Sequence, residues 1–543
     1  MKSNSCFHAA AVFLLAVIAA SCSNGIDVNF RLVNPCLEDV LFKDNQCQFL
    51  RLIISSLDPQ DILNPIHIGE PGGGPIVHDC NIGDGSCSLA GDELLGLARI
   101  VDILCFTSGE TAPVARATSQ AMMFADGAGG VGSTTMNLMI ANIDNFTETT
   151  VLSNREDPTT VGDCSLLGQG EIGRYGHTAT LLDDGRVLIA GGIRRLGTVE
   201  DVLSTAEIFD PVTGRHQLVV DQHGEALKMA APSGRAFHTA NRLRDGRVLL
   251  AGGVGLVEGQ RSTLQSAELF DPYTNTFGTI SVMGTGRAHH AATMLATGEV
   301  LVTGGASYNN GVIASYFNNA IIYRPDTNGW EPVSSNMSVA RAFHQAVLLD
   351  PSKYGGNVVV IGGENADGPH NTIDIYNAQA NQFYSNVNVT MGKNRSHLCA
   401  VRLANGEVMV AGGKTTVDDI SVDAGVEFYN PGVPDFGEFR PETLNLQVAR
   451  MDHACTLLDT DNVLVTGGMT SSSNGIGIGE LVLVGSSYSV QTISDDFLDP
   501  PRFSHTATLL RNGWVFISGG LPSAAPAAVP VIQSMYFTPG PTF

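Results

Sequence analysis

The chain has 543 residues, of which 43% are apolar and 15% are charged, and it contains 61 glycines. This length is enough for more than one domain, and a glycine-rich chain with few charges is typical of packed strands joined by turns. Acidic residues outnumber basic ones by 54 to 30, and the formal charge of -24 excludes nucleic acid as an expected partner because its phosphates would be repelled.

Residues 1–21 have the length and order of a signal peptide. Lys2 precedes an apolar run at residues 9–20, and small residues then lead to Cys22. The sequence Ala19-Ala20-Ser21-Cys22 resembles a bacterial lipobox, with alanine where leucine is usual, and Ser23 resembles an outer-membrane sorting signal. The resemblance implies lipidation of Cys22 as the new N-terminus, and ordinary cleavage nearby is the alternative.

No later apolar run approaches the length that is needed to cross a bilayer. We therefore expect an exported outer-membrane lipoprotein on the periplasmic or the cell-surface side. Its contact with the membrane would be through the lipid anchor only.

Residues 22–158 carry no repeat and are predicted to form a small β domain, possibly a sandwich. Strand-like apolar runs are separated by breaks rich in Gly, Pro and Asn, and they lie at residues 28–33, 47–55, 97–106 and 136–143.

An even group of cysteines in an exported chain indicates disulfides. The six candidates are Cys36, Cys47, Cys80, Cys87, Cys105 and Cys164. Proximity suggests Cys36 with Cys47 and Cys80 with Cys87, but the connectivity stays open. The spacings are not those of a zinc site, so no metal is expected.

One phrase is then repeated seven times: Arg, two residues, usually His, an apolar stretch, a turn, a second apolar stretch and Gly-Gly. Successive copies start 61, 52, 54, 54, 55 and 52 residues apart, at Arg174, Arg235, Arg287, Arg341, Arg395, Arg450 and Arg502. The glycine pairs start at Gly191, Gly252, Gly304, Gly362, Gly412, Gly467 and Gly519. Strand-and-turn units with this period predict a radial array of small sheets, so residues 159–543 are expected to form a seven-bladed β-propeller.

Each copy supplies four strands. In the first copy Asp183-Asp184-Gly185 joins the first two, because this kind of turn needs a positive φ. A third strand ends at proline, as in Ala206 to Pro211, and a weaker fourth strand follows, as in Trp330 to Val333. The seventh copy reaches only its third strand, and we expect the stretch around Thr160 to Leu167 to complete that blade and cover its edge.

Arg-x-x-His, Asp-Gly-Arg-Val-Leu, Gly-Gly and Glu-x-aromatic-Asp-Pro together resemble the kelch repeat. Among kelch propellers, the repeat resembles the one at the centre of galactose oxidase and of many bacterial extracytoplasmic proteins. This resemblance implies an all-β fold with seven blades. The copper site of that oxidase is not expected, because none of the 14 histidines adjoins a tyrosine, and no cofactor is expected.

The resemblance also implies a ligand site. In kelch domains that bind peptides, the repeat arginine lies near the mouth of the central channel, and guanidinium groups bind carboxylates with two parallel hydrogen bonds. The ligand-binding candidates at the propeller mouth are therefore Arg174, Arg235, Arg287, Arg341, Arg395, Arg450 and Arg502. The alternative is that each arginine bonds carbonyls or a carboxylate between blades.

Two further sets of repeated residues are predicted to be structural. Six copies carry a histidine three residues after the arginine: His177, His238, His290, His344, His453 and His505. They should pack between blades and hydrogen-bond to neighbouring backbone, and residues spread around a ring cannot share one metal ion. Carboxylates begin the third strand of four copies: Glu207, Glu268, Asp374 and Glu427. We expect them to cap strands or pair with the repeat arginines.

The loops between the second and third strands differ in every copy, and variable loops on a constant scaffold are where binding specificity usually lies. They cover residues 193–205, 254–266, 306–319, 414–425 and 469–479. Cys399 and Cys455 lie near the start of the first strand in neighbouring copies. They could meet across blades, but we expect buried free thiols.

The sequence identifies no catalytic residue. We expect an extracytoplasmic kelch-repeat binding or scaffold protein without enzymatic activity, a monomer that interacts with a protein or glycan at the cell envelope. Two alternatives stay open: a carbohydrate-active enzyme of the oxidase or mutarotase type, and a purely structural envelope protein.

Overall fold

The computed structural model describes residues 173–537 except 197–198, 213, 222–225, 230–233, 258, 418–419, 433–435, 441–443, 486, 494–497 and 499. Before residue 173 it describes the backbone of nine strands, β1–β9. Nearly every described element is a strand, and the one described helix is the short α2, Pro351–Tyr354. The prediction of an all-β fold is confirmed. No helix in the described part of the chain is long and apolar enough to span a membrane.

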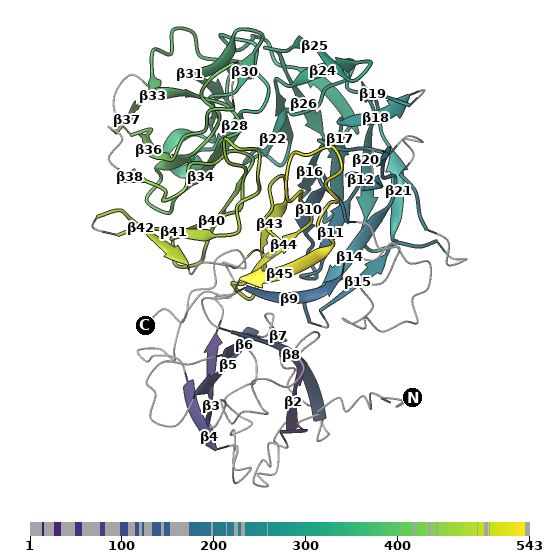
Figure 1. Cartoon of the computed structure of the whole chain (residues 1–543), viewed down its shortest axis with the longest axis vertical. Coiled ribbons are helices and arrows are strands. Elements are labelled where there is room, and N and C mark those ends of the chain that lie inside the picture. Colours follow the sequence, from purple (N-terminus) through teal and green to yellow (C-terminus); the bar gives the residue numbers. More distant parts are fainter. Residues whose placement is uncertain are drawn as a thin grey trace.

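The repeats form a seven-bladed β-propeller (Figure 1), in which each blade is an antiparallel sheet. Blades one to three are β10 Thr178–Leu181, β11 Val187–Ala190, β14 Ala206–Asp210 and β15 Arg215–Leu218; β16 Thr239–Arg242, β17 Val248–Ala251, β20 Ala267–Asp271 and β21 Thr276–Thr279; and β22 Ala291–Met294, β23 Val300–Thr303, β26 Ala320–Arg324 and β27 Gly329–Pro332.

Blades four and five contain extra pairings. They are β28 Gln345–Leu348, β29 Val358–Ile361, β31 Gly368–Asn377 and β32 Gln382–Phe383, with β30 Glu364–Asn365 and β33 Thr390–Arg395 also on β31; and β34 Cys399–Arg402, β35 Val408–Ala411, β36 Gly425–Asn430 and β37 Glu438–Phe439, with β38 Leu444–Asn445 also on β36. Blades six and seven are β39 Ala454–Leu457, β40 Val463–Thr466, β41 Gly479–Leu483 and β42 Ser489–Ile493; and β43 Thr506–Leu509, β44 Val515–Ser518, β45 Gln533–Phe537 and β9 Phe146–Val151.

Blade seven takes its fourth strand from the segment before the repeats. β9 pairs antiparallel with β45, with Phe146 opposite Phe537 and Val151 opposite Gln533. The stretch that we expected there, Thr160 to Leu167, lies outside the described residues. Residues 146–151 combine one aromatic with four β-branched residues, whereas 160–167 contain Gly162 and Asp163, which disfavour a strand.

The remaining N-terminal strands form one sheet of their own. They are β1 Leu14–Leu15, β2 Asp27–Val33, β3 Phe49–Ser56, β4 Ile76–Asn81, β5 Ala98–Phe106, β6 Ala115–Thr118, β7 Met122–Met123 and β8 Ser133–Asn142. The order is β1-β2-β8-β6-β5-β3-β4, with β7 on β5, and β2 and β8 are parallel. Four of these strands coincide with the predicted apolar runs. The side chains of the six candidate disulfide cysteines, and Cys22, lie outside what the structure describes.

The core lies between the blades. All four residues of the second strand are buried in each blade, because its two faces pack against the two neighbouring blades. The cluster that closes the ring contains Val187, Ile189 and Phe209 of blade one with Phe516 and Tyr536 of blade seven, and the rings of Phe209 and Phe516 stack at 4.1 Å. Burial between blades therefore stabilises the closed ring as well as each sheet.

The glycine pair is needed because two blades meet there. Gly252 and Gly253 have φ values of 64° and 93°. A Cβ on Gly252 would lie 2.5 Å from the carbonyl oxygen of Arg287 in the next blade, and the Gly253 N–H donates to that oxygen at 2.9 Å. Only glycine combines this backbone conformation with this approach.

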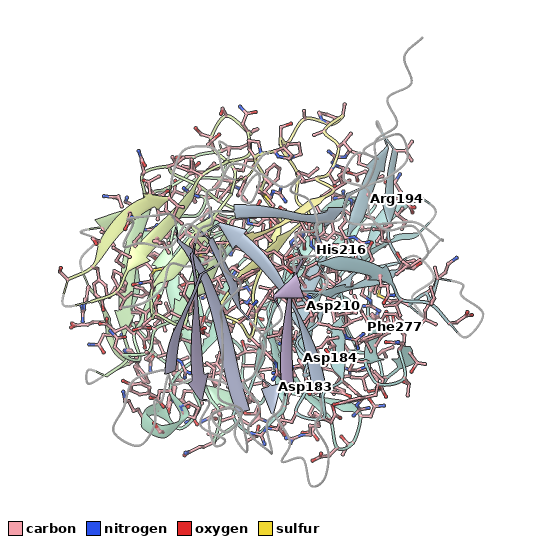
Figure 2. The ribbon with its side chains drawn as sticks, turned by 90° about the horizontal axis from the view of Figure 1, so that it is seen from below. Asp183, Asp184, Arg194, Asp210, His216 and Phe277 are labelled. Carbon is pink, nitrogen blue, oxygen red and sulfur yellow. A yellow bond between two sulfur atoms is a disulfide. The ribbon has the colours of Figure 1, made fainter. Side chains whose placement is uncertain are left out.

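The strand order gives the propeller two distinct faces. Each repeat arginine and each loop between strands two and three lie at one end of the blades, which we call the loop face. The turns between strands one and two lie at the other end, the turn face. Figure 2 shows both ends of blade one, with Arg194 on the loop face and Asp183 and Asp184 on the turn face.

Candidate functional site around the propeller axis

The seven repeat arginines are all fully buried. In every blade the guanidinium donates to the carbonyl of the first glycine of that blade's pair, with N–O distances of 2.7 to 3.3 Å. None of these guanidinium groups is exposed at the channel mouth for binding a ligand, because each already donates hydrogen bonds within its own blade. The alternative interpretation, bonds to carbonyls and carboxylates, describes their observed contacts.

Carboxylates of the third strand complete this buried layer in five blades. The ion pairs are Arg174–Glu207, Arg235–Glu268, Arg341–Asp374, Arg395–Glu427 and Arg450–Glu480. The predicted pairing is thus confirmed for four carboxylates, and Glu480 was missed because Val482 stands two residues after it, where the other four strands have an aromatic residue. In blade three Ile321 replaces the carboxylate, Asn319 accepts from Arg287 at 3.2 Å, and burial lowers the pKa of Arg287 to about 10.

The repeat histidines lie between blades, as predicted, and backbone groups contact three of them, namely His290, His344 and His453. Side-chain hydroxyls of the preceding blade are additional partners. The Nε2 atoms of five histidines lie 2.8 to 3.1 Å from a threonine Oγ1: His177 and Thr506, His238 and Thr178, His290 and Thr239, His344 and Thr303, and His505 and Thr466. Burial lowers the pKa of His177 and His344 to about 3, so these rings are neutral. Copy five has Leu398 instead, and it faces Ile361 rather than a hydroxyl.

Two residues separate the arginine from the histidine position in each copy. The second of them, directly before the histidine position, forms what we call the axial ring. Its members are Gly176, Phe237, His289, Phe343, His397, Asp452 and Ser504. All seven have φ values between 51° and 62°. Each N–H donates to the carbonyl of the member in the preceding blade, at 2.8 to 3.5 Å, so seven backbone hydrogen bonds close a circle around the axis.

Unlike their buried neighbours, the members of the axial ring are partly exposed. Four aromatic rings follow one another around it, with centroids 4.5 Å apart for Phe237 and His289, 4.2 Å for His289 and Phe343, and 4.1 Å for Phe343 and His397. The circle of backbone hydrogen bonds fixes the Cα positions of the axial ring, whereas the side chains on it vary from blade to blade. The axial ring therefore presents different side chains from one regular backbone.

A hydrogen-bonded acid–base pair continues this arc. His397 Nδ1 lies 2.7 Å from Asp452 Oδ1, and its Nε2 lies 4.0 Å from Glu364 Oε1. Burial acts to lower the pKa of His397, but the Asp452 carboxylate and then Glu364 outweigh it and raise that pKa. Glu364 also accepts from Ser396 Oγ at 2.7 Å and Lys414 Nζ at 3.3 Å. Residues of three blades thus converge here, and none of them was singled out from the sequence.

The variable loops form hairpins over the axis. Three have regular strands, namely β12 Ile193–Leu196 with β13 Val199–Val202, β18 Val254–Val257 with β19 Gln260–Thr263, and β24 Ala306–Asn309 with β25 Val312–Tyr316. Glu200 of the first hairpin accepts from Tyr175 at 2.8 Å and from Arg195 at 2.6 Å, and it pairs with Arg261 of the second. Charged contacts therefore join the hairpins of blades one and two beside Phe237.

The two faces differ in what they expose. Of the seven large hydrophobic residues that are exposed in the described part of the chain, four lie in loops between strands two and three: Val199, Val312, Val417 and Val529, which are 51 to 66% exposed. Tyr273, 75% exposed, lies on the turn face. The turn face otherwise carries ion pairs, such as Arg186 with Asp184 and Arg324 with Glu331.

One group of described side chains could hold a metal ion: Cys399, His453 and Cys455. Cys399 and Cys455 are joined by a disulfide between β34 and β39, so the expectation of free thiols is wrong. The first strands of adjacent blades run side by side around the axis, and this brings together two cysteines that are 56 residues apart in the sequence.

Comparison with known proteins adds little to this geometry. No known protein family matches the sequence, and no curated protein matches it. A solved structure titled "Structure of YjhT" is similar over 59% of this chain and 97% of its own, with 16% sequence identity and a TM-score of 0.45.

Proposed function

We propose that the protein is an extracytoplasmic binding protein whose propeller, of the kelch type, holds a protein or glycan partner on the loop face. The repeat motifs support the kelch assignment, and residues 1–22 support export and lipid anchoring at Cys22 in an outer membrane. The partner would then be met at the cell envelope.

This proposal rests on the contrast between the buried layer and the exposed side chains of the loop face. The buried layer repeats from blade to blade, whereas the axial ring holds five different residue types in seven blades, the hairpins differ in sequence, and the axial ring is partly exposed. Exposed valines on the hairpin loops add apolar contact area to a rim of charged side chains, and protein interfaces combine these two features.

Binding can be tested with a face-specific pair of variants. The full chain would be presented to a glycan array and to envelope extract, in parallel with Val199→Ser/Val312→Ser and with Tyr273→Ser as the turn-face control. We expect the loop-face variant to lose the captured partner and the control to keep it. Equal capture by both variants would contradict a loop-face site.

A second candidate, a carbohydrate-active enzyme, is favoured by one observation. His397, Asp452 and Glu364 come from three blades and meet at the axis, where an imidazole and carboxylates could exchange protons with a sugar hydroxyl. Turnover of a sugar that His397→Gln abolishes would support this function. Sugar binding without turnover would leave the binding function in place.

A further inference from the structure

Blades five and six depart from the repeat at two positions that meet in space. The second residue after the histidine position is alanine in six blades: Ala179, Ala240, Ala292, Ala346, Ala400 and Ala507. Blade six has Cys455 there. Blade five has Cys399 one position earlier along its own strand, where blades one and two have Thr178 and Thr239.

Because of these departures, His453 of blade six has different neighbours from the other repeat histidines. In the blade before each of the five histidines that have a hydroxyl at Nε2, the first residue of strand one or the last residue of strand two is threonine or serine. In blade five these two residues are Cys399 and Ala411. Both ring nitrogens of His453 are buried, and the imidazole has no hydroxyl partner in the described part of the chain; it contacts the backbone of Ala411. A ring nitrogen that does not meet a hydroxyl can bind another ligand.

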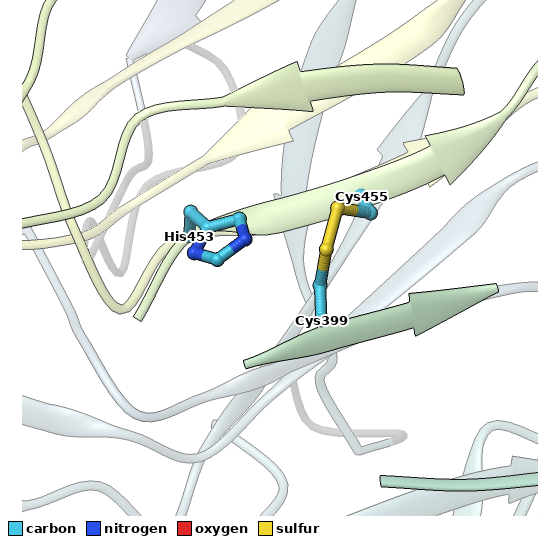
Figure 3. A group of neighbouring side chains, drawn as sticks. All are labelled: Cys399, His453 and Cys455. Atoms are coloured by element: carbon cyan, nitrogen blue, oxygen red, sulfur yellow. A yellow bond between two sulfur atoms is a disulfide. The ribbon is translucent and has the colours of Figure 1, made fainter. Parts of the chain in front are cut away.

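The three side chains point toward one another (Figure 3). One ligand atom from each of Cys399, His453 and Cys455 lies within 4.8 Å of the others, and the Cα atoms of the cysteines are 5.9 Å apart. A neutral imidazole can donate a ring-nitrogen lone pair to a metal ion. Two thiolates and one imidazole are a donor set that zinc takes in proteins.

We propose that reduction of the Cys399–Cys455 disulfide turns this contact between blades five and six into a site for one Zn²⁺ ion, held by both thiolates and a ring nitrogen of His453. A dithiol reductant supplies two electrons and two protons, becoming a disulfide as the S–S bond breaks into two thiols. Zn²⁺ then displaces the two thiol protons. A second disulfide reverses the sequence: it takes two electrons from the thiolates and two protons from solvent, becomes two thiols, and the re-formed Cys399–Cys455 bond releases the ion because a disulfide provides no thiolate.

This inference is independent of the partner on the loop face. A purely structural disulfide would need the two cysteines only, and the zinc site adds a role for the buried imidazole beside them. Soft thiolate ligands with imidazole favour zinc over calcium or magnesium, which prefer oxygen ligands.

The test compares the wild-type chain with Cys399→Thr/Cys455→Ala. This variant restores the residues of other blades, including a hydroxyl for His453, so we expect it to fold. Both proteins keep all other cysteines. Each is reduced with a phosphine and titrated with Co²⁺, a spectroscopic substitute, and then with Zn²⁺. Reduced wild type should bind one more ion per chain than the variant and show thiolate-to-cobalt charge-transfer bands, and the oxidised wild type should not.

Equal stoichiometry in the two reduced proteins would overturn the proposal. His453→Leu, which copies Leu398 of blade five, should weaken zinc binding about tenfold or more while the sulfur bands persist. Unchanged zinc affinity would show that the imidazole is not a ligand and would overturn the proposed site. If reduction unfolds the wild-type chain, its circular dichroism should recover on addition of Zn²⁺, and a chain that stays unfolded would count against the site.

Discussion

The buried layer and the axial ring come from the same four-residue phrase, and yet they have opposite properties. Arginine and histidine point between blades, are buried, and meet recurring partners. The residue before the histidine turns toward the axis with a positive φ, is partly exposed, and is phenylalanine, histidine, aspartate, serine or glycine depending on the blade. A repeat can therefore hold its backbone constant at a position whose chemistry is free to vary.

The largest effect is expected in the buried layer. Glu480→Ala leaves Arg450 buried without its counter-charge, and breaking a buried pair in this way typically costs about 3–5 kcal/mol. Glu299→Ala, which removes a partly exposed partner of Arg324 on the turn face, should cost about 1 kcal/mol or less. Denaturant unfolding measures both, and equal costs would show that the layer is not what stabilises the ring.

Acid should weaken the same layer through its histidines. His344 has a pKa of about 3 in the fold and about 6.5 unfolded, so between these values only the unfolded chain binds the proton. Stability is therefore lost as pH falls from 6.5 toward 3, by up to about 1.4 kcal/mol per pH unit for each such histidine.

A matched double variant tests the contribution of the proton that His344 binds on unfolding. His344→Leu/Thr303→Ile copies the pair of Leu398 and Ile361 between blades four and five. Melting curves from pH 7 to pH 4 should show a slope that is smaller by one proton. An unchanged slope would mean that His344 is not the neutral, buried group that the structure shows.

His397 in the axial ring should respond to pH with the opposite sign and a smaller effect. The pKa of His397 is raised in the fold, so its contribution is fully present below about pH 6.5 and is lost as pH rises through the folded value. His397→Gln should cost about 1.5–3 kcal/mol at pH 5.5, the range for a charge-assisted hydrogen bond, and less at pH 9. A cost that grows with pH would rule out a charged His397–Asp452 pair.

The smallest effect on stability is expected at the hairpin tips. Val312 is 66% exposed, and Val312→Ser should change the free energy of unfolding by about 0.5 kcal/mol or less. A large melting shift for this variant would place Val312 in a packed contact and would argue against a free loop-face surface.

Much of the frame could be predicted from the sequence, because each blade repeats a local pattern. Turn residues with positive φ and apolar runs of four residues specify a hairpin wherever they occur, so the strands and the pairing of Glu207, Glu268, Asp374 and Glu427 with arginines followed from spacing. Glu480 was missed because its strand has Val482 in place of the usual aromatic residue, and β9 was missed because strand propensity alone does not say which distant segment will pair with β45.

The candidate site could not be predicted in the same way. His397, Asp452 and Glu364 lie in blades five, six and four, and their approach depends on the curvature of the whole ring. The disulfide between Cys399 and Cys455 depends on the same curvature, which sets the first strands of adjacent blades side by side.

By itself the sequence determined the number of blades, the four-strand unit and the residues that repeat in it, because these depend on local turn chemistry and on periodic apolar runs. The tertiary structure alone decided that the repeat arginines are sealed between blades while the residues beside them face the axis. The physical reason is that a positive φ reverses the direction of one side chain between two buried ones, and only the closed ring shows what that side chain meets.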